Sequence, residues 1–300
     1  MPSLPRMNRL TSDRIEQLTT MHPEWQPWLE VLGRALRETG NPIWQSSVPA
    51  PVAPRDGAAP LLARAVIRVD SGATRRWIHE LFAAAAGAGY AMAQRIASEG
   101  AERGEALAIL ESAISLDASR FENLIGNSSA QGFRALAEIA ALPLLQACGE
   151  RWAAAVPVSW HHGYCPVCGA WAALAEARGV ERSRRLRCVR CGSDWPAEES
   201  LCVFCGNRDP ERLGVLVEDA GAGRRQVEAC AACGNYVKTV ATLESSPRHE
   251  VILDDLASVD LDLAALSEGY LRPGRRPCAI SARVLERRRG LRSRLLHLFS

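Results

Sequence analysis

Residues 165–234 read CPVCGAWAALAEARGVERSRRLRCVRCGSDWPAEESLCVFCGNRDPERLGVLVEDAGAGRRQVEACAACG, and one motif occurs in them four times. Each copy is a Cys-x-x-Cys pair followed by glycine, at 165–169, 188–192, 202–206 and 230–234. In such a knuckle two thiolates approach one face of a metal ion, and glycine permits the positive φ that closes the turn. Because two knuckles complete a tetrahedron, the eight cysteines predict two closed metal sites of four cysteines each.

The loop lengths between the knuckles favour a sequential grouping over a nested or interleaved one. Nineteen residues separate Cys168 from Cys188, and 24 separate Cys205 from Cys230. Each loop has room for two or three short strands, which is typical of ribbon-type sites. The expected metal ligands are therefore Cys165, Cys168, Cys188 and Cys191 in site 1, and Cys202, Cys205, Cys230 and Cys233 in site 2.

The spacing does not choose the metal, because a tetrahedral set of four sulfurs suits zinc and a rubredoxin-like single iron equally. A structural zinc that only folds two small modules is one interpretation. A dithiol oxidoreductase is another, but it requires one pair at a helix N-terminus after a strand. Here four equivalent pairs lie among segments that we expect to form hairpins.

The chain on either side of the motifs is expected to be helical. Residues 25–36 carry tryptophan and leucine at steps of three and four, and Ala/Leu-rich stripes continue to about residue 155. The fold class is therefore α+β, an N-terminal helical bundle followed by tandem rubredoxin-like or zinc-ribbon β modules and a late helix. We expect a helical domain at 1–156, two ribbon modules within 157–245 at about 161–197 and 200–242, a helix at 246–270 that packs back on the body, and a basic tail at 271–300.

Composition limits the function classes. The 300 residues carry 36 basic and 34 acidic side chains, a balance that does not favour a nucleic acid or a membrane as the main partner. Residues 1–10 lack the apolar segment of a signal peptide, and the nearly apolar run at 81–93 is too short to span a bilayer. We therefore expect a cytoplasmic chain with no transmembrane segment, in which paired cysteines indicate metal or redox chemistry.

Several residues near the motifs need an interpretation. His161 and His162 precede the first knuckle, but with four thiolates available we expect them outside the ligand set. Cys148 is expected to be a small buried hydrophobe and Cys278 a surface thiol. The only lysine, Lys238, follows the fourth knuckle; it could contact the thiolate charge or a partner, or be an ordinary surface charge.

The ordered motifs resemble those of the FdhE family of formate dehydrogenase accessory proteins. The resemblance rests on the four knuckles, on Trp195, on Tyr236 with Lys238, and on the DDLA run at 254–257. It covers roughly residues 157–270, while the first half of the chain fits the family only in length and character. One departure is Trp171, where the family more often has proline.

The resemblance implies a non-catalytic, cytoplasmic maturation factor that binds the catalytic subunit of a molybdenum- or tungsten-pterin formate dehydrogenase. It also implies rubredoxin-like iron on the eight cysteines, and it transfers no catalytic or cofactor-binding residue. The residues themselves agree, since no nucleophile triad, phosphate-binding glycine loop or site-like carboxylate pair is evident. The alternative is a zinc-ribbon adaptor, structural or nucleic-acid-binding through the arginine-rich segments 182–190 and 272–294. Oligomeric state is not predicted.

The tail at 271–300 alternates leucine with arginine from Leu285 onward. This pattern predicts a basic amphipathic helix that contacts an acidic partner surface, or a solvated terminal helix. The acidic pair Asp254 and Asp255 is expected to favour the N-terminus of the late helix or to contact a partner.

Overall fold

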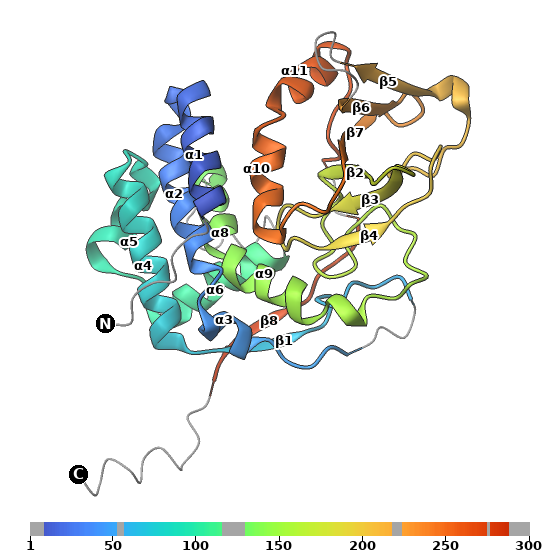
Figure 1. Cartoon of the computed structure of the whole chain (residues 1–300). Coiled ribbons are helices and arrows are strands. Elements are labelled where there is room, and N and C mark those ends of the chain that lie inside the picture. Colours follow the sequence, from blue (N-terminus) through green and yellow to red (C-terminus); the bar gives the residue numbers. More distant parts are fainter. Residues whose placement is uncertain (1–8, 53–56, 116–129, 218–223, 275–276, 288–300) are drawn as a thin grey trace, which may run out of the picture.

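The computed structural model describes residues 9–52, 57–115, 130–217, 224–274 and 277–287, with helices gathered on one side and a β-sheet on the other (Figure 1). The first helices are α1 (Arg9–Met21), α2 (Gln26–Glu38), α3 (Pro42–Ser47), α4 (Ser71–Gly87), α5 (Gln94–Glu99), α6 (Arg103–Ser115), α8 (Ala130–Ala140) and α9 (Leu142–Arg151). The strands are β1 (Val66–Val69), β2 (Leu174–Arg178), β3 (Ser183–Arg187), β4 (Asp194–Pro196), β5 (Leu213–Val217), β6 (Arg225–Cys230), β7 (Asn235–Thr242) and β8 (Arg283–Glu286). The late helices are α10 (Val251–Leu256) and α11 (Val259–Ser267), and single 3-10 turns lie at Pro23–Trp25, Ala91–Ala93, Ala153–Ala155, Pro210–Arg212 and Arg248–Glu250. The predicted α+β class, with helices first and cysteine-bearing strands later, is confirmed.

The helical half forms where the sequence places apolar stripes and helix starts. In α2 the predicted stripe is buried, with Leu29, Leu32 and Leu36 all at most 4% exposed. Helix α4 begins after Asp70, whose carboxylate accepts a hydrogen bond from the N–H of Ala73 at 2.8 Å. This N-cap satisfies one of the donors that a helix start leaves without a partner.

Helix α4 lies at the centre of the helical half, where it contacts α2, α5, α6 and α8. Its Trp77 and Phe82 are buried, and the ring of Phe82 packs against Phe133 of α8 with centroids 5.4 Å apart. Those rings are core residues, as their helical spacing predicts. The same hydrophobic core continues without interruption into the first two knuckles, whose four cysteines belong to it.

The strands from both cysteine-rich stretches join one six-stranded sheet. Its order is β4-β3-β2-β7-β6-β5, and all neighbours are antiparallel except β2 and β7, which run parallel with Leu174 opposite Lys238. Helix α11 covers one face of the sheet at β6 and β7. A second, smaller core forms there from Val227, Ala229, Tyr236, Leu261 and Ala265.

The C-terminal segment does not follow its helical prediction. Residues Arg283–Glu286, which include Leu285, form strand β8 and pair in parallel with β1, so that Val66 lies opposite Arg283. The expectation of helices throughout the first half is likewise wrong at β1. The amphipathic leucine–arginine pattern is equally compatible with alternating strand faces, and the long-range pairing decides between them. The remainder of the predicted basic helix, at 288–300, lies outside the described residues.

The late helix predicted within 246–270 is two helices, since the chain turns at Ala257–Ser258 between α10 and α11. Helix α10 contacts α1, where Arg14 forms ion pairs with Glu250 at 2.9 Å and with Asp254 at 2.6 Å. Helix α11 contacts β6 and β7. Among the described helices, none combines the length and the apolar character that crossing a bilayer requires.

Candidate metal centres

All four Cys-x-x-Cys-Gly stretches fold into the same turn. In each, the glycine N–H donates a hydrogen bond to the carbonyl oxygen of the first cysteine, at 2.9, 2.9, 2.9 and 2.8 Å in chain order. The four glycines have φ values of +71°, +66°, +76° and +70°. Residues with a Cβ adopt this left-handed region only with strain, so the predicted role of glycine is confirmed.

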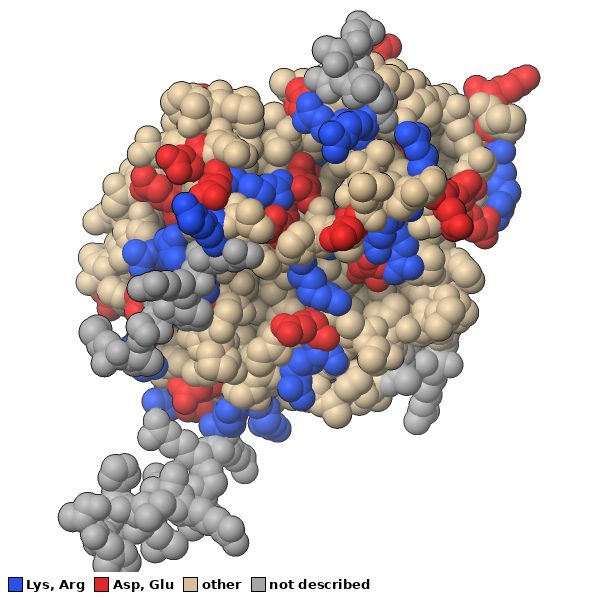
Figure 2. Space-filling model, in the orientation of Figure 1, with Lys and Arg blue, Asp and Glu red and all other residues tan. Residues whose placement is uncertain are grey.

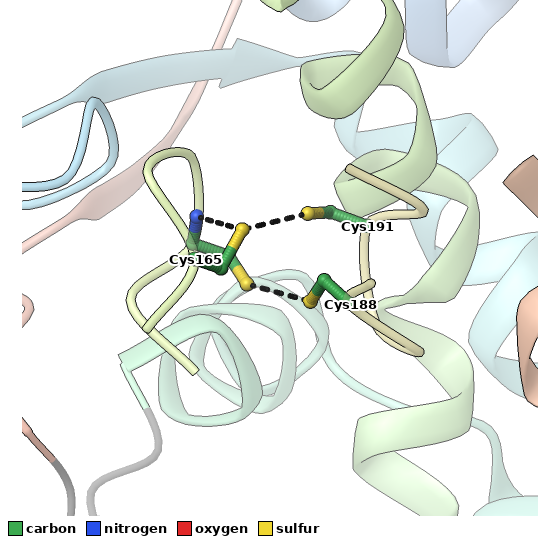
Figure 3. Close-up of side chains that lie close together, drawn as sticks. Cys165, Cys188 and Cys191 are labelled. Atoms are coloured by element: carbon green, nitrogen blue, oxygen red, sulfur yellow. Dashed lines mark hydrogen bonds between the residues drawn. The ribbon is translucent and has the colours of Figure 1, made fainter. Parts of the chain in front are cut away.

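Site 1 consists of the cysteines of the first two knuckles (Figure 3). The Sγ atoms of Cys165 and Cys191 are 3.4 Å apart, as are those of Cys168 and Cys188. All four sulfurs lie within 4.8 Å of one another, and all four side chains are 0% exposed. The N–H of Cys168 also donates to the Sγ of Cys165 at 3.4 Å. The two knuckles thus face each other across a closed, buried centre.

Site 2 consists of the cysteines of the third and fourth knuckles. The Sγ of Cys202 lies 3.7 Å from that of Cys233, and the Sγ of Cys205 lies 3.8 Å from that of Cys230. These four sulfurs also lie within 4.8 Å of one another. Cys202 and Cys230 are buried, but Cys205 is exposed and Cys233 is half-buried. The two groups therefore follow the sequential order along the chain and differ in their exposure.

The donor sets fit metal binding. Four sulfurs bonded at roughly 2.3 Å to a tetrahedral ion are separated by about 3.8 Å. The separations of 3.4 to 3.8 Å across the two groups agree with this geometry. Each group could hold one ion, and four thiolates suit zinc and a single iron alike. That these eight cysteines are metal ligands stays a prediction.

Site 1 favours a negative charge on one of its sulfurs. Hydrogen bonds from the thiols of Cys165, Cys188 and Cys191 hold the pKa of Cys168 well below its usual range, and the nearby charge of Arg190 acts in the same direction. Because the thiolate is the form that binds a metal, a buried group that already stabilises one thiolate is suited to a cation.

The two cysteines outside the motifs both lie next to site 1. Cys148, in α9, is 0% exposed, as predicted for a small buried hydrophobe. Burial raises the pKa of its thiol well above the usual value, and the charges of Cys191 and Cys168 add to this. Cys278 is half-buried with its Sγ 4.0 Å from the carbonyl oxygen of Gly169, so the prediction of a surface thiol is corrected.

The two histidines belong to neither group of four sulfurs that the described residues form. His161 is exposed. The ring of His162 stacks on Tyr164 at 4.8 Å between centroids and meets Trp160 edge-on at 4.9 Å. Its position is thus in an aromatic cluster beside the first knuckle.

Trp171, the departure from the family pattern, links the two centres physically. Its ring meets Tyr164, next to the first knuckle, at 6.0 Å and Phe204, inside the third knuckle, at 5.5 Å. The backbones of Tyr164 and Trp171 also form an isolated antiparallel β-bridge. The tryptophan therefore packs between the knuckles of site 1 and site 2, and it displaces no cysteine.

Lys238 is buried in an ion cluster, so the expectations of a thiolate contact, a partner contact or a surface charge are wrong. The side chain is 0% exposed, and its Nζ lies 2.8 Å from Asp255 and 2.7 Å from Asp262. Arg272, from the predicted basic tail, pairs with the same two carboxylates at 2.6 and 2.8 Å. Tyr236 donates its hydroxyl to Asp262 at 2.5 Å. The cluster fastens α11 to the sheet.

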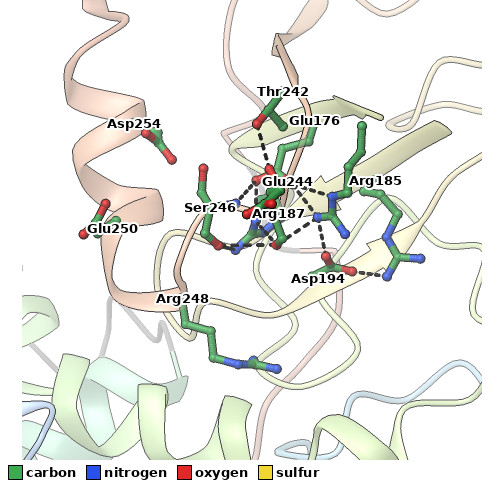
Figure 4. A network of polar contacts seen from close by, with 12 residues as sticks. Glu176, Arg185, Arg187, Asp194, Thr242, Glu244, Ser246, Arg248, Glu250 and Asp254 are labelled. Atoms are coloured by element: carbon green, nitrogen blue, oxygen red, sulfur yellow. Dashed lines mark hydrogen bonds and ion pairs between the residues drawn. The ribbon is translucent and has the colours of Figure 1, made fainter. Parts of the chain in front are cut away.

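The arginine-rich segment 182–190 makes internal contacts. Arg187, 1% exposed, pairs with the buried Glu176 of β2, and Arg185 pairs with Asp194 of β4 (Figure 4). Arg184 likewise pairs with Glu228 at 2.5 Å. On the face shown in Figure 2, basic and acidic side chains are interspersed, which is unlike the continuous basic surface of a phosphate-binding protein.

One contact had no signal in the sequence. Helix α9 presses on the second knuckle at Gly149, where an added Cβ would lie only 2.0 Å from the carbonyl oxygen of Cys191. A glycine in an alanine-rich helix is ordinary by itself, and only the fold shows that this one is required for the approach.

A helical body joined to a sheet that carries two pairs of Cys-x-x-Cys knuckles defines a protein with two groups of four cysteines, each of which could hold one metal ion. A family profile described as FdhE, C-terminal domain, matches residues 202–278. That region contains all of site 2, α10 and α11. This part of the chain is therefore similar to the C-terminal domain of the FdhE family.

Curated relatives show the same likeness over a similar share of the chain. The chain is 31% identical over 116 residues to an FdhE homologue of Aquifex aeolicus, covering 38% of this chain and 40% of the relative. It is 33% identical over 119 residues to one from Haemophilus influenzae, covering 39% and 38%, and 32% identical over 116 residues to the FdhE protein of Escherichia coli O127:H6, covering 38% and 37%. The chain thus spans about two fifths of the length of the curated relatives it matches.

A solved structure extends the likeness to the helical half. The crystal structure of the FdhE protein from Pseudomonas aeruginosa matches with a TM-score of 0.53 at 23% sequence identity, covering 90% of this chain and 94% of the other. At this identity the match concerns the fold.

Proposed function

We propose that this protein is a non-catalytic accessory factor for the maturation of formate dehydrogenase, acting in the cytoplasm on the catalytic subunit. The observation that carries the proposal is the FdhE C-terminal domain match at residues 202–278, because it covers the segment in which the cysteines of site 2 gather. The likeness to FdhE indicates the process, the maturation of formate dehydrogenase. The two groups of four cysteines are the side chains that we expect to take part in it.

The proposal includes one metal ion in each group of four cysteines, with iron favoured by the family resemblance and zinc as the other option. Four protein thiolates complete a tetrahedron and leave no open position for a substrate, which supports a non-enzymatic role. When bound, the ion would cross-link two knuckles and, if it is iron, could also carry one electron. The chain contributes the ligands, the turn glycines and the backbone N–H groups that stabilise thiolate charge.

The test is a deletion of the gene in its own host. We expect formate-dependent dye reduction to be lost while the dehydrogenase polypeptide remains visible on an immunoblot, and the wild-type gene should restore activity. Normal activity in the deletion strain would overturn the proposal. Absence of the dehydrogenase polypeptide would also overturn it, since the role would then lie in synthesis.

The partner and the compartment are tested separately. A tagged catalytic subunit expressed in the same cells should retain this protein on an affinity column, and cell fractionation should recover it in the cytoplasmic fraction. A tagged dehydrogenase subunit of another type serves as the control. Retention by both subunits, or by neither, would contradict specific binding to the catalytic subunit.

A further inference from the structure

The space around the four knuckle glycines differs between site 1 and site 2. A Cβ added to Gly169 would lie within 3.0 Å of Cys278 Sγ and Pro60, and one added to Gly192 would lie 2.6 Å from Arg248 Cβ. A Cβ added to Gly206 or Gly234 would meet no atom within 4 Å. The same turn is therefore enclosed at the two knuckles of site 1 and open at the two knuckles of site 2.

Site 1 is enclosed by segments from distant parts of the sequence. The N–H groups of Leu61 and Leu62 donate to the carbonyl oxygens of Pro166 and Val167, inside the first knuckle, at 2.8 and 2.9 Å. Helix α9 closes on the second knuckle at Gly149. With its cysteines in the main hydrophobic core, site 1 opens only if the packing of the helical half opens with it.

Arg248 adds a clamp on the same side of site 1. Its Nη1 donates to the carbonyl oxygen of Gly149 at 3.0 Å and approaches that of Gly192 at 3.5 Å. One guanidinium thus joins helix α9 to the second knuckle. The cysteines of site 2 do not belong to either of the hydrophobic cores.

Site 2 is open on two sides. On the outer side Cys205 is exposed and Cys233 is half-buried. On the inner side a cavity of about 420 Å³ is lined by the other two ligands, Cys202 and Cys230, and by Val215 of β5. This volume lies within the usual range of small-molecule sites, about 300–1,000 Å³.

The charged side chains that line the cavity balance one another. Arg184 pairs there with Glu228 at 2.5 Å, and Arg208 of the lining pairs with Glu198 at 2.6 Å. The remaining charged residues of the lining, Glu199 and the arginine at position 182, carry opposite charges. A small thiol or chelating ligand could therefore reach Cys202 and Cys230 through the cavity without crossing the core.

We infer that site 2 is an exchangeable metal centre, open to soluble thiol and chelating ligands through the cavity and the exposed Cys205, whereas site 1 keeps its metal until the chain unfolds. This inference rests on the part of the proposed function in which both groups bind metal. It assigns different roles to the two centres. Site 1 stabilises the fold, and site 2 is where a metal ion binds, dissociates or contacts an external thiolate.

The test uses the metal-loaded full chain, with 4-(2-pyridylazo)resorcinol as the chelator and N-ethylmaleimide as the thiol label. The metal content is measured first, and we expect two ions per chain. One ion should then leave on the order of tenfold or more faster than the other, because a local opening has a lower free energy than global unfolding. Peptide mapping should find label on the four cysteines of site 2 before any on site 1.

A matched pair of variants tests the cavity itself. Val215→Trp, at a residue that lines the cavity, should slow the release of the fast ion several-fold and leave the slow ion unchanged. Val217→Trp, on the same strand and equally exposed at 54% against 53%, is not among the lining residues and should have no effect. Equal effects of the two variants would overturn the route through the cavity.

The remaining outcomes are decisive too. A single release rate for both ions, earlier labelling of site 1, or fewer than two ions per chain would each overturn the inference. None of these readouts uses formate dehydrogenase. A deletion strain with normal formate-dependent activity would therefore overturn the maturation role and leave a measured difference between the centres standing.

Discussion

The two groups of four cysteines are built from the same turn, yet they lie in different environments. In site 1 all four side chains are 0% exposed and belong to the main core, while in site 2 Cys205 is exposed and a cavity reaches Cys202 and Cys230. The pentapeptide motif determines the local geometry of a knuckle. The lability of a centre is set by the segments that pack on it, and these come from elsewhere in the chain.

The largest expected difference follows from removing one ligand of each centre. Cys168→Ser should abolish folding or yield insoluble protein, because a core centre without metal forfeits much of the roughly 5–15 kcal/mol that stabilises a domain. Cys205→Ser should remain soluble and helical and should retain one ion. Circular dichroism and metal analysis of the two purified variants check this, and similar behaviour of both would refute the comparison.

The next largest effect concerns the cluster that fastens α11 to the sheet on the site 2 side. Lys238→Met removes the buried partner of Asp255 and Asp262 and leaves them paired with Arg272 alone, so the loss should be at most the about 3–5 kcal/mol of a fully broken buried ion pair. Urea unfolding measures the loss. The control is Arg103→Met, which removes an exposed pair with Glu286 at 3.2 Å and should change stability by at most about 1 kcal/mol.

If the two substitutions had equal effects on urea unfolding, the buried cluster would contribute no more than a surface pair. If Lys238→Met also released the ion of site 1, the sheet would have to transmit the damage across β2 and β7. Either result would weaken the distinction between the two halves of the sheet.

A smaller effect is expected where α9 presses on site 1. Gly149→Ala places a Cβ 2.0 Å from the carbonyl oxygen of Cys191 and should destabilise the protein by about 1–3 kcal/mol through overpacking. Gly104→Ala is the matched control, a helical glycine with no atom within 4 Å of the new Cβ. It should stabilise α6 by about 0.5–1 kcal/mol. Thermal unfolding gives both values, and changes of the same sign would argue against the close contact.

The smallest expected effect concerns the reaction of Cys148 with a thiol label, which should not change with pH in the native protein. Since burial raises the pKa of Cys148 well above its ordinary value of 9.0, its thiol stays protonated in the folded protein as the pH rises from 7 to 9. We expect N-ethylmaleimide to leave Cys148 unlabelled throughout this interval in native protein and to label it fully after denaturation. Labelling of native Cys148 that grows with pH would show that the helix over site 1 opens.

The sequence was sufficient to predict the repeated turn, because a Cys-x-x-Cys-Gly knuckle is held by contacts within five residues. It also predicted the buried stripe of α2 and, apart from β1, the helical character of the first half, since helical periodicity is a local property. The α+β class followed from those two signals. Each prediction depended on residues close together in the chain.

The features that sequence reasoning missed all depend on distant pairs. Nothing near Lys238 indicates that Asp262 and Arg272 will enclose it, and nothing near Leu285 indicates that β1 will pair with its strand. The unequal exposure of the centres has the same origin, since the enclosing residues Leu61 and Gly149 lie far upstream of the knuckles. Because the four motifs are so similar, the sequence did not indicate which of the two centres is the more exposed.

The parallel pairing of β1 with β8 bears on how the chain matures during its own synthesis. β1 leaves the ribosome early, but its partner is made only after both cysteine centres have been translated. The edge of β1 that pairs with β8 therefore stays unpaired while the knuckles leave the ribosome. The cysteines of site 1 are therefore all synthesised before β8 can pair with β1 and close the body.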